Sequence, residues 1–187
     1  MSTEPSSRIP TDPNFRYSWY AKLIFANQRR RYGKELEPAR LWARTPKVFA
    51  ALSLLYGALD RRRSPIEPAL RSLITVRVSQ INWCAFCVDI NSATGLKRGV
   101  SDAQLAALAE FETSPLFDER QKAALAYAEA ITRTDVGVDD ALMARVKACF
   151  DDNAVIELTA LIAFQNMSSK FNSALDVAPQ GFCRLPR

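Results

Sequence analysis

Histidine is absent from all 187 residues of the chain. This side chain most often carries protons near neutral pH, so any acid–base chemistry here must use other groups. The sequence also lacks an apolar run of about 20 residues, the length that spans a bilayer, and its first residues lack the apolar stretch of a signal peptide. We therefore expect a cytoplasmic protein with no membrane partner.

Cysteine is scarce, with four in the chain, too few for a fold held together by disulfides. Cys84 and Cys87 are separated by two residues, a spacing that places both on one face of a helix and within reach of a disulfide. A closed zinc site needs about four ligands and would have to add the distant Cys149 and Cys183. We therefore expect no bound metal and interpret the pair as redox-active.

Glycine is also rare, with six residues, and no glycine-rich nucleotide-binding loop occurs, so we expect no cofactor. The net charge of +5 includes two arginine triplets, at 29–31 and 61–63. Both triplets fall where predicted helices end, and cations there offset the negative end of the helix dipole. Because no continuous basic stripe accompanies them, we expect no nucleic-acid partner.

Apolar residues recur at three- and four-residue intervals along most of the chain, which is typical of amphipathic helices. The predicted helices span residues 15–32, 46–60, 65–82, 83–97, 101–108, 118–131, 139–150 and 153–170. Strands and helices do not alternate as they would in an α/β protein. We therefore predict an all-α fold, a compact multi-helix bundle of antiparallel helices with short connections.

One segment, residues 74–78, is β-branched enough to resemble a strand. Polar residues interrupt it at helical spacing and no partner strand is found nearby, so we predict a helix there as well. The chain is predicted to form a flexible N-terminal arm (1–14), a single helical domain (15–176) and a non-helical C-terminal tail (177–187) that packs on the domain or on a neighbour.

The cysteine pair has two interpretations at this point. With Asn82 as the N-cap, Cys84 and Cys87 would lie in the first turns of a helix, where unpaired amide groups and the positive helix end favour a thiolate. A thiolate can attack a hydroperoxide to give a sulfenic acid, which the second cysteine converts to a disulfide. The alternative is that both cysteines pack inertly, as small apolar residues do.

The segment LRSLITVRVSQINWCAFCVDIN, residues 70–91, resembles the core of the alkylhydroperoxidase D and carboxymuconolactone decarboxylase superfamily. The similarity extends over roughly residues 45–175 and implies that superfamily's helical fold. It also implies a thiol-dependent hydroperoxide reductase, an antioxidant activity of the alkylhydroperoxidase and peroxiredoxin type, or a disulfide reductase. In this resemblance Cys87 attacks the peroxide and Cys84 resolves the intermediate.

Two positions depart from the peroxidase branch of that superfamily. Ser72 and Asn91 stand where the branch carries the glutamate and the histidine of its proton relay. Neither titrates near neutral pH, and loss of a positioned acid–base group typically lowers a rate about 10²–10⁴-fold, so we expect weak activity. The remaining titratable candidates are Asp89, expected to be a salt-bridge or surface residue on another face of the helix, and the more distant Glu157.

Two other functions stay open. A decarboxylase acting on a lactone acid would need a cationic clamp for the carboxylate, for which Arg77 is the candidate, although such helix arginines are more often structural. A non-enzymatic redox sensor or oligomeric protein would keep the fold without catalysis. Asn166 and Asn172 match polar positions of the superfamily's last core helix, and we expect them to serve packing and hydrogen bonding.

We expect the protein to assemble as a homo-oligomer. A helix carrying Tyr17, Tyr20 and Phe25, together with an apolar tail, offers more hydrophobic surface than one small bundle needs. The resemblance is compatible with a dimer, a trimer or a hexamer. It also implies two further partners, a small hydroperoxide substrate and a thiol or dithiol electron donor.

Overall fold

The computed structural model describes residues 7–10, 12 and 14–183, and every regular element within them is helical. The prediction of an all-α fold is therefore confirmed. The elements are α1 (Trp19–Tyr32), α2 (Glu37–Trp42), α3 (Pro46–Leu59), α4 (Pro68–Ile81), α5 (Ala85–Lys97), α6 (Asp102–Ala106), the 3-10 helix η1 (Leu108–Glu110), α7 (Glu119–Thr132), α8 (Asp140–Cys149) and α9 (Asp152–Ala174). Among the described residues, no helix combines the length and the apolar character needed to cross a membrane.

Several of these helices begin and end at the residues that the sequence predicts. Ser101 and Asp118 form capping boxes at the starts of α6 and α7, in which the side chain accepts the backbone N–H of the third helical residue. Gly33 ends α1 in the left-handed region, with φ of 75°. The β-branched residues 74–78 lie inside α4, so their interpretation as a helix is confirmed.

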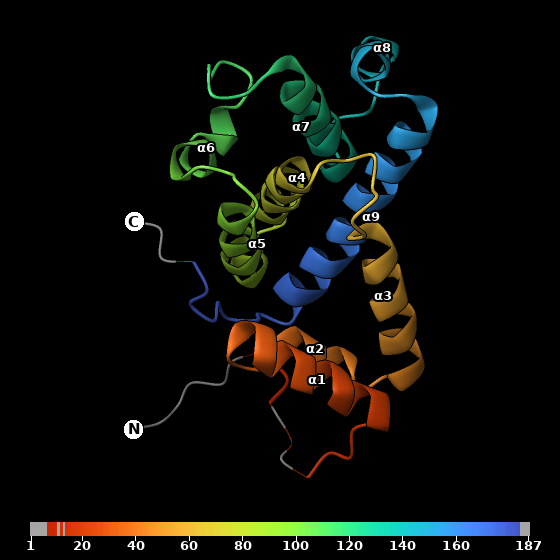
Figure 1. Cartoon of the computed structure of the whole chain (residues 1–187), viewed down its shortest axis with the longest axis vertical. Helices are drawn as coiled ribbons and strands as arrows, with labels where there is room; N and C mark the ends of the chain where they lie inside the picture. The colour runs from red at the N-terminus through yellow and green to blue at the C-terminus, as the bar shows by residue number, and fades with distance from the viewer. Residues whose placement is uncertain (1–6, 11, 13, 184–187) are drawn as a thin grey trace.

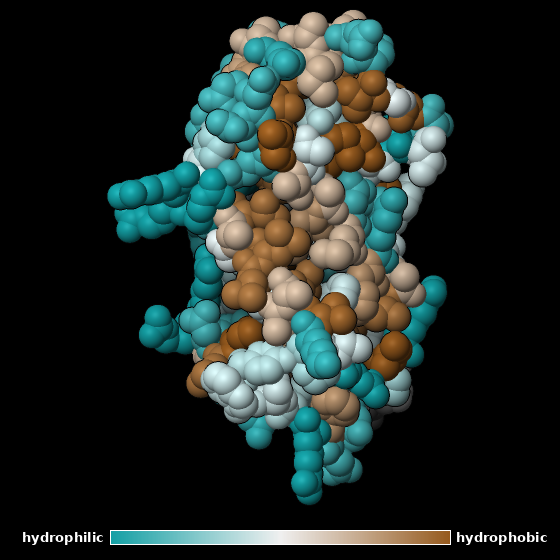
Figure 2. Space-filling view, turned by 90° about the vertical axis from the view of Figure 1, so that its right-hand side faces the viewer, coloured by the Kyte–Doolittle hydropathy of each residue, from teal (hydrophilic) through white to brown (hydrophobic). Residues whose placement is uncertain are grey.

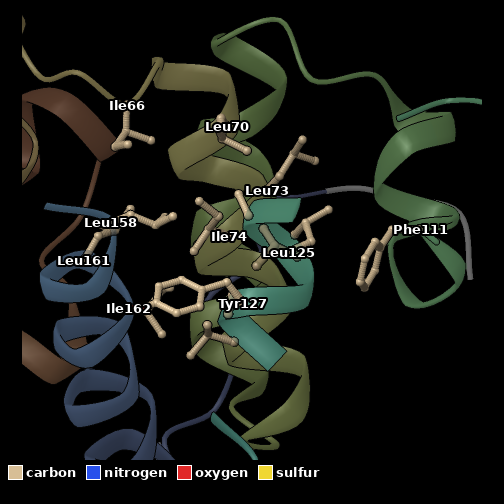
Figure 3. Close-up of a cluster of buried hydrophobic side chains, with 14 of the residues drawn as sticks. Ile66, Leu70, Leu73, Ile74, Phe111, Leu125, Tyr127, Leu158, Leu161 and Ile162 are labelled. Atoms are coloured by element: carbon tan, nitrogen blue, oxygen red, sulfur yellow. The ribbon is translucent and has the colours of Figure 1, made fainter. Parts of the chain in front are cut away.

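The core is built around α4, which packs against α5, α7 and α9 (Figure 1). Figure 3 shows Leu73 and Ile74 of α4 meeting Leu125 of α7 and two residues of α9, Leu158 and Ile162. All five side chains are fully buried. Because burial of one such side chain contributes about 1.5–3 kcal/mol, this cluster holds α4 firmly, together with the turn that follows it.

A second layer, formed by α1, α2 and α3, lies outside this core (Figure 1). It has a smaller buried cluster of its own, made of Ala21, Phe25, Ala39, Ala43 and Phe49. The layer differs from the prediction in two respects. The first helix begins at Trp19 rather than at residue 15, because the Ser18 side chain caps it. The short helix α2 was not predicted, since six residues are too few for a periodic pattern.

The two ends of the described chain contact the domain. The backbone N–H of Arg8 donates to the carbonyl of Leu175 over 2.7 Å, which places this part of the N-terminal segment against the end of α9. After α9, Phe182 packs edge-on against Phe86 of α5 and Tyr32 of α1, with ring centroids 6.4 and 5.8 Å apart. Residues 1–6, 11 and 13 of the predicted arm and 184–187 of the predicted tail lie outside the described residues.

Candidate functional site

The cysteine pair lies at the turn between α4 and α5. Asn82 is the C-cap of α4 and not the N-cap of the next helix, which corrects the prediction. Trp83 follows with a left-handed φ of 55°, and Cys84 then caps α5 itself: its Sγ accepts the backbone N–H of Cys87 over 3.2 Å. The two thiols are only 2% and 3% exposed, and no disulfide joins them. Both thiols therefore lie near the start of a helix, as predicted. Cys84 is the N-cap of α5 and Cys87 lies in its first turn.

The two thiols titrate as a pair because they share a hydrogen bond. The bond that the Cys87 thiol donates lowers the pKa of Cys84, as do the backbone N–H of Cys87 and the Asn172 amide, although burial opposes this shift. The same bond and burial raise the pKa of Cys87. These opposite directions favour the first negative charge of the pair at Cys84 rather than at Cys87.

Neutral polar groups of α4, α5 and α9 surround the pair. Asn172 Nδ2 donates to Cys87 Sγ over 3.1 Å, while its Oδ1 has no hydrogen-bond partner among the described residues. Gln165 Nε2 and Asn91 Nδ2 both donate to Ser79 Oγ, over 2.9 and 3.4 Å. Amide N–H groups favour a negative sulfur without titrating themselves, so this network stabilises a thiolate but cannot relay a proton.

The substituted relay positions lie beside the pair without contacting each other. Ser72 is buried and donates to the carbonyl of Pro68 over 3.1 Å, one helical turn earlier. Asn91 donates to Ser79 instead. A Cβ added at Gly95 would lie 3.3 Å from Ser72 Cβ, so α4 and α5 approach closely at this point. Both relay positions line one cavity with Cys87.

Contrary to expectation, Asp89 is buried rather than at the surface, and its carboxylate accepts hydrogen bonds from backbone amides rather than from a cation. Its side chain is on another face of α5, as predicted, but only 8% of the residue is exposed. Its two carboxylate oxygens accept the backbone N–H groups of Gln180 and Cys183, over 2.8 and 2.7 Å. Asp89 therefore fastens the C-terminal tail to α5, and its carboxylate bonds to this tail rather than to either thiol.

Two other predicted candidates are engaged away from the cysteines. Arg77 forms a salt bridge with Glu129 of α7 and donates to Gln80, which supports its structural interpretation. Glu157 binds Arg61 and Ser64 at the start of α9. Neither Arg77 nor Glu157 lines the cavity that Cys87 faces. Within the described part of the chain, no three histidine, cysteine, aspartate or glutamate side chains gather as ligands for a metal ion.

A cavity of about 400 Å³ separates the outer layer from the core. Its walls come from α1–α5 and α9 and are mainly apolar, with the rings of Trp42, Phe49, Phe86 and Phe164 among them. Cys87 is among the residues that line this cavity and Cys84 is not, although both belong to one buried cluster that includes tail residues. The volume fits a small organic molecule, and such a molecule would meet the sulfur of Cys87 first.

Comparison with known proteins agrees with this architecture. Residues 46–130 match the carboxymuconolactone decarboxylase family. The uncharacterised protein YnjA of Escherichia coli (strain K12) is 48% identical over 190 residues, covering 100% of this chain and 98% of YnjA. The chain belongs to the alkylhydroperoxidase D and carboxymuconolactone decarboxylase superfamily. The prediction of this membership is thereby confirmed.

Two solved structures show the superfamily fold at lower identity. A peroxidase-related protein from Ralstonia eutropha JMP134, described as an alkylhydroperoxidase AhpD core, superposes with a TM-score of 0.85 over 96% of both chains at 20% identity. The debrominase Bmp8 superposes with a TM-score of 0.77 over 88% of both chains at 22% identity. At these identities the similarity establishes the shared fold of the superfamily and nothing finer.

Sequence reasoning missed the contact between Asn172 and Cys87, because the two residues are 85 positions apart. A signal for it was nevertheless present. Gln165, Ser169 and Asn172 recur at four- and three-residue spacing within a largely apolar helix, and all three are buried. A polar stripe on a buried helix face indicates that something polar lies opposite. Asn166, by contrast, bonds to Asn82 and serves packing, as predicted.

Proposed function

We propose that the protein is a thiol-dependent reductase of organic hydroperoxides, with Cys87 as the attacking sulfur and Cys84 as its partner. The observation that carries this proposal is that the two cysteines differ in position and in the direction of their pKa shifts. Cys87 lines a cavity of about 400 Å³, while Cys84 caps α5, does not line the cavity and has a pKa lowered by its hydrogen bonds. Membership of the superfamily, whose solved relatives include an alkylhydroperoxidase AhpD core, supports the same chemistry.

The shared hydrogen bond lets Cys84 perform the proton transfers that a relay would otherwise perform. The Cys84 thiolate takes the proton of Cys87, and the resulting Cys87 thiolate attacks the terminal oxygen of the hydroperoxide. The O–O bond breaks, Cys87 becomes a sulfenic acid, and the departing alkoxide receives the proton from Cys84 and leaves as an alcohol. The Cys84 thiolate then attacks the sulfenic sulfur, which releases hydroxide and forms the disulfide.

The balance of this cycle is one dithiol monoanion plus one hydroperoxide, giving one disulfide, one alcohol and one hydroxide. A small thiol or dithiol must then return the disulfide to the dithiol, and a reducing cytoplasm supplies such donors. Because one sulfur serves as base, acid and resolving nucleophile, we expect turnover to be slower than with a separate relay.

The decarboxylase alternative is less well supported, because Arg77, its candidate for binding the carboxylate, forms a salt bridge with Glu129.

The decisive experiment mixes the reduced protein with tert-butyl hydroperoxide in a stopped-flow instrument and then maps the alkylated cysteines by mass spectrometry. We expect one equivalent of peroxide to produce a disulfide between Cys84 and Cys87, and repeated turnover with dithiothreitol as donor. Cys149→Ser is the matched control and should leave both results unchanged. Failure to form a peroxide-driven disulfide in the wild-type protein refutes the proposal, and one oxidation without turnover favours a redox sensor.

The proposed enzyme assembles through the outer face of α3. Between Val48 and Leu59 this helix carries no charged residue, and only Phe49 and Leu59 of the whole helix are buried. Figure 2 shows brown apolar side chains gathered along this side of the molecule, where Leu54 is 76% exposed. An uncharged apolar face of this kind suits a second copy of itself across a two-fold axis. Leu54→Glu should therefore lower the mass measured by light scattering, whereas an unchanged mass would contradict this interface.

A further inference from the structure

The cavity contains a second polar feature at the end of α5 opposite the cysteines. Arg98 Nη2 contacts both carboxylate oxygens of Asp60 over 2.8 Å, and Arg71 Nη2 lies 3.5 Å from the same carboxylate. Arg71 Nη1 donates to the carbonyl of Arg61, while its Nε has no hydrogen-bond partner among the described residues. Arg71 is only 5% exposed and lines the cavity together with Arg98 and Asp60.

This cluster carries more positive than negative charge. Two guanidinium groups share the single carboxylate of Asp60, and Arg31 adds a third cation where the cavity opens. The nearby Glu157 is already paired with Arg61. Burial lowers the pKa of Arg71, which reflects the cost of holding this charge away from water. An excess of buried positive charge in a cavity wall is stabilised by an anion that enters the cavity and accepts hydrogen bonds from the guanidinium groups that line it.

We infer that Arg71 and Arg98 form a carboxylate-binding subsite and that the substrate is a medium-chain organic hydroperoxide with a carboxylate at its other end. This inference deepens the proposed function and rests on it for the reactive end of the substrate. The apolar rings between the two ends of the cavity, such as Phe49 and Phe164, contact the chain of the substrate. Guanidinium is the cation best shaped to bind a carboxylate through two N–H groups.

The spacing along α5 sets the length of this substrate. Cys87, Asn91, Thr94 and Arg98 recur at four-, three- and four-residue intervals and all line the cavity, so one helix face joins the two ends. Eleven residues at the rise of an α-helix correspond to about 16 Å between the two backbone positions. Helical side chains lean toward the N-terminus, which brings the Arg98 guanidinium closer to Cys87. Hydrogen peroxide is too small to reach both ends.

A binding experiment tests the subsite without any redox step. Calorimetry on the reduced wild-type protein compares octanoate with octanamide, which has the same chain but no charge. We expect octanoate to bind about tenfold more tightly or better, as a charge-assisted contact predicts. Arg71→Gln should abolish this preference, and Arg62→Gln, which removes an exposed arginine outside the cavity, should retain it. Equal affinities for the two ligands in the wild-type protein overturn the subsite, whether or not the variants fold.

A kinetic experiment separates the subsite from the proposed function. It compares a medium-chain hydroperoxide that carries a carboxylate with neutral tert-butyl hydroperoxide. In Arg71→Gln, and independently in Arg98→Gln, we expect the ratio of kcat/KM for the charged substrate to kcat/KM for the neutral one to fall about tenfold or more. Turnover of both peroxides without this difference refutes the subsite alone. Preferential binding of octanoate without turnover of either peroxide preserves the subsite and refutes the reductase.

Discussion

Replacement of Asn172 by leucine should remove thiolate from the cysteine pair while leaving the fold intact. The Asn172 amide donates to Cys87 Sγ over 3.1 Å, and its N–H groups favour the charged form of both cysteines. Its Oδ1 is buried without a partner among the described residues, so leucine also removes an unsatisfied acceptor. The two effects on stability oppose each other, and we expect a change in unfolding free energy within about 1 kcal/mol.

The effect on ionisation follows from the energy of the lost contact. A hydrogen bond to a charged group contributes about 1.5–3 kcal/mol, which corresponds to an equilibrium change of about 10- to 100-fold. At a fixed pH below the first transition of the pair, Asn172→Leu should therefore contain about 10- to 100-fold less thiolate than the wild-type protein. The sign is fixed because the lost group favoured the deprotonated form, so the titration curve moves to higher pH.

The assay is a pH titration of thiolate by its ultraviolet absorbance, in a background in which Cys149 and Cys183 are replaced by serine. Asn166→Leu is the matched control. Asn166 lies on the same helix but bonds to Asn82 and Thr132 rather than to a thiol, so this control should lose stability without moving the curve. A titration curve for Asn172→Leu that coincides with the wild-type curve refutes the role assigned to this amide.

Three further predictions concern the surroundings of the site. Trp83→Gly should raise the free energy of unfolding by about 1 kcal/mol in guanidinium chloride titrations, because glycine tolerates the φ of 55° that strains tryptophan, and a loss of stability would contradict this. Asp89→Asn removes one of two charge-assisted acceptors, so we expect a loss of about 2–3 kcal/mol and faster hydrogen exchange at the Gln180 amide; unchanged exchange would show that the tail is held otherwise. Desolvation, and to a smaller extent the charge of Asp60, raise the pKa of Tyr56 from 10.0 to about 12. The tyrosine of the unfolded chain therefore loses its proton at lower pH than that of the folded protein, so the free energy of unfolding should fall as the pH rises from 10 to 12. Because the Tyr56 residue is 46% exposed, only part of that fall is expected, and Tyr56→Phe should show a smaller one.

The fold was accessible from the sequence wherever a local signal was strong. Ser101, Asp118 and Gly33 mark helix ends through chemistry that acts within one turn, and the periodicity of the long core helices needs no tertiary information. The short helix α2 was not accessible, because its six residues are held by packing against α1 and α3. Asn82 was misassigned because the sequence does not show that α4 extends to Ile81 and leaves Cys84 as the next cap.

At the candidate site, too, local features were accessible from the sequence and long-range contacts were not. The spacing of Cys84 and Cys87 and the substitutions at Ser72 and Asn91 are local features of the sequence, and Ser72, Cys87 and Asn91 line one cavity. The position of Asp89 was predicted only in part. Its helix face follows from periodicity, but its burial depends on a tail that reaches it from 91 and 94 positions away. Contacts of that separation leave no local pattern for a single sequence to show.

The long separation between Cys87 and Asn172 also determines when the thiols become chemically distinct. The amide that lowers both pKa values reaches the pair only when α9 lies against α5, 85 positions further along the chain. In an unfolded chain the same cysteines are ordinary thiols, with pKa values near 8.5. The distinct pKa values of the two thiols are therefore a property of the native state. A substitution that lowers the folded fraction of the protein lowers the amount of this reactive dithiol by the same factor, however far the substitution lies from the cysteines.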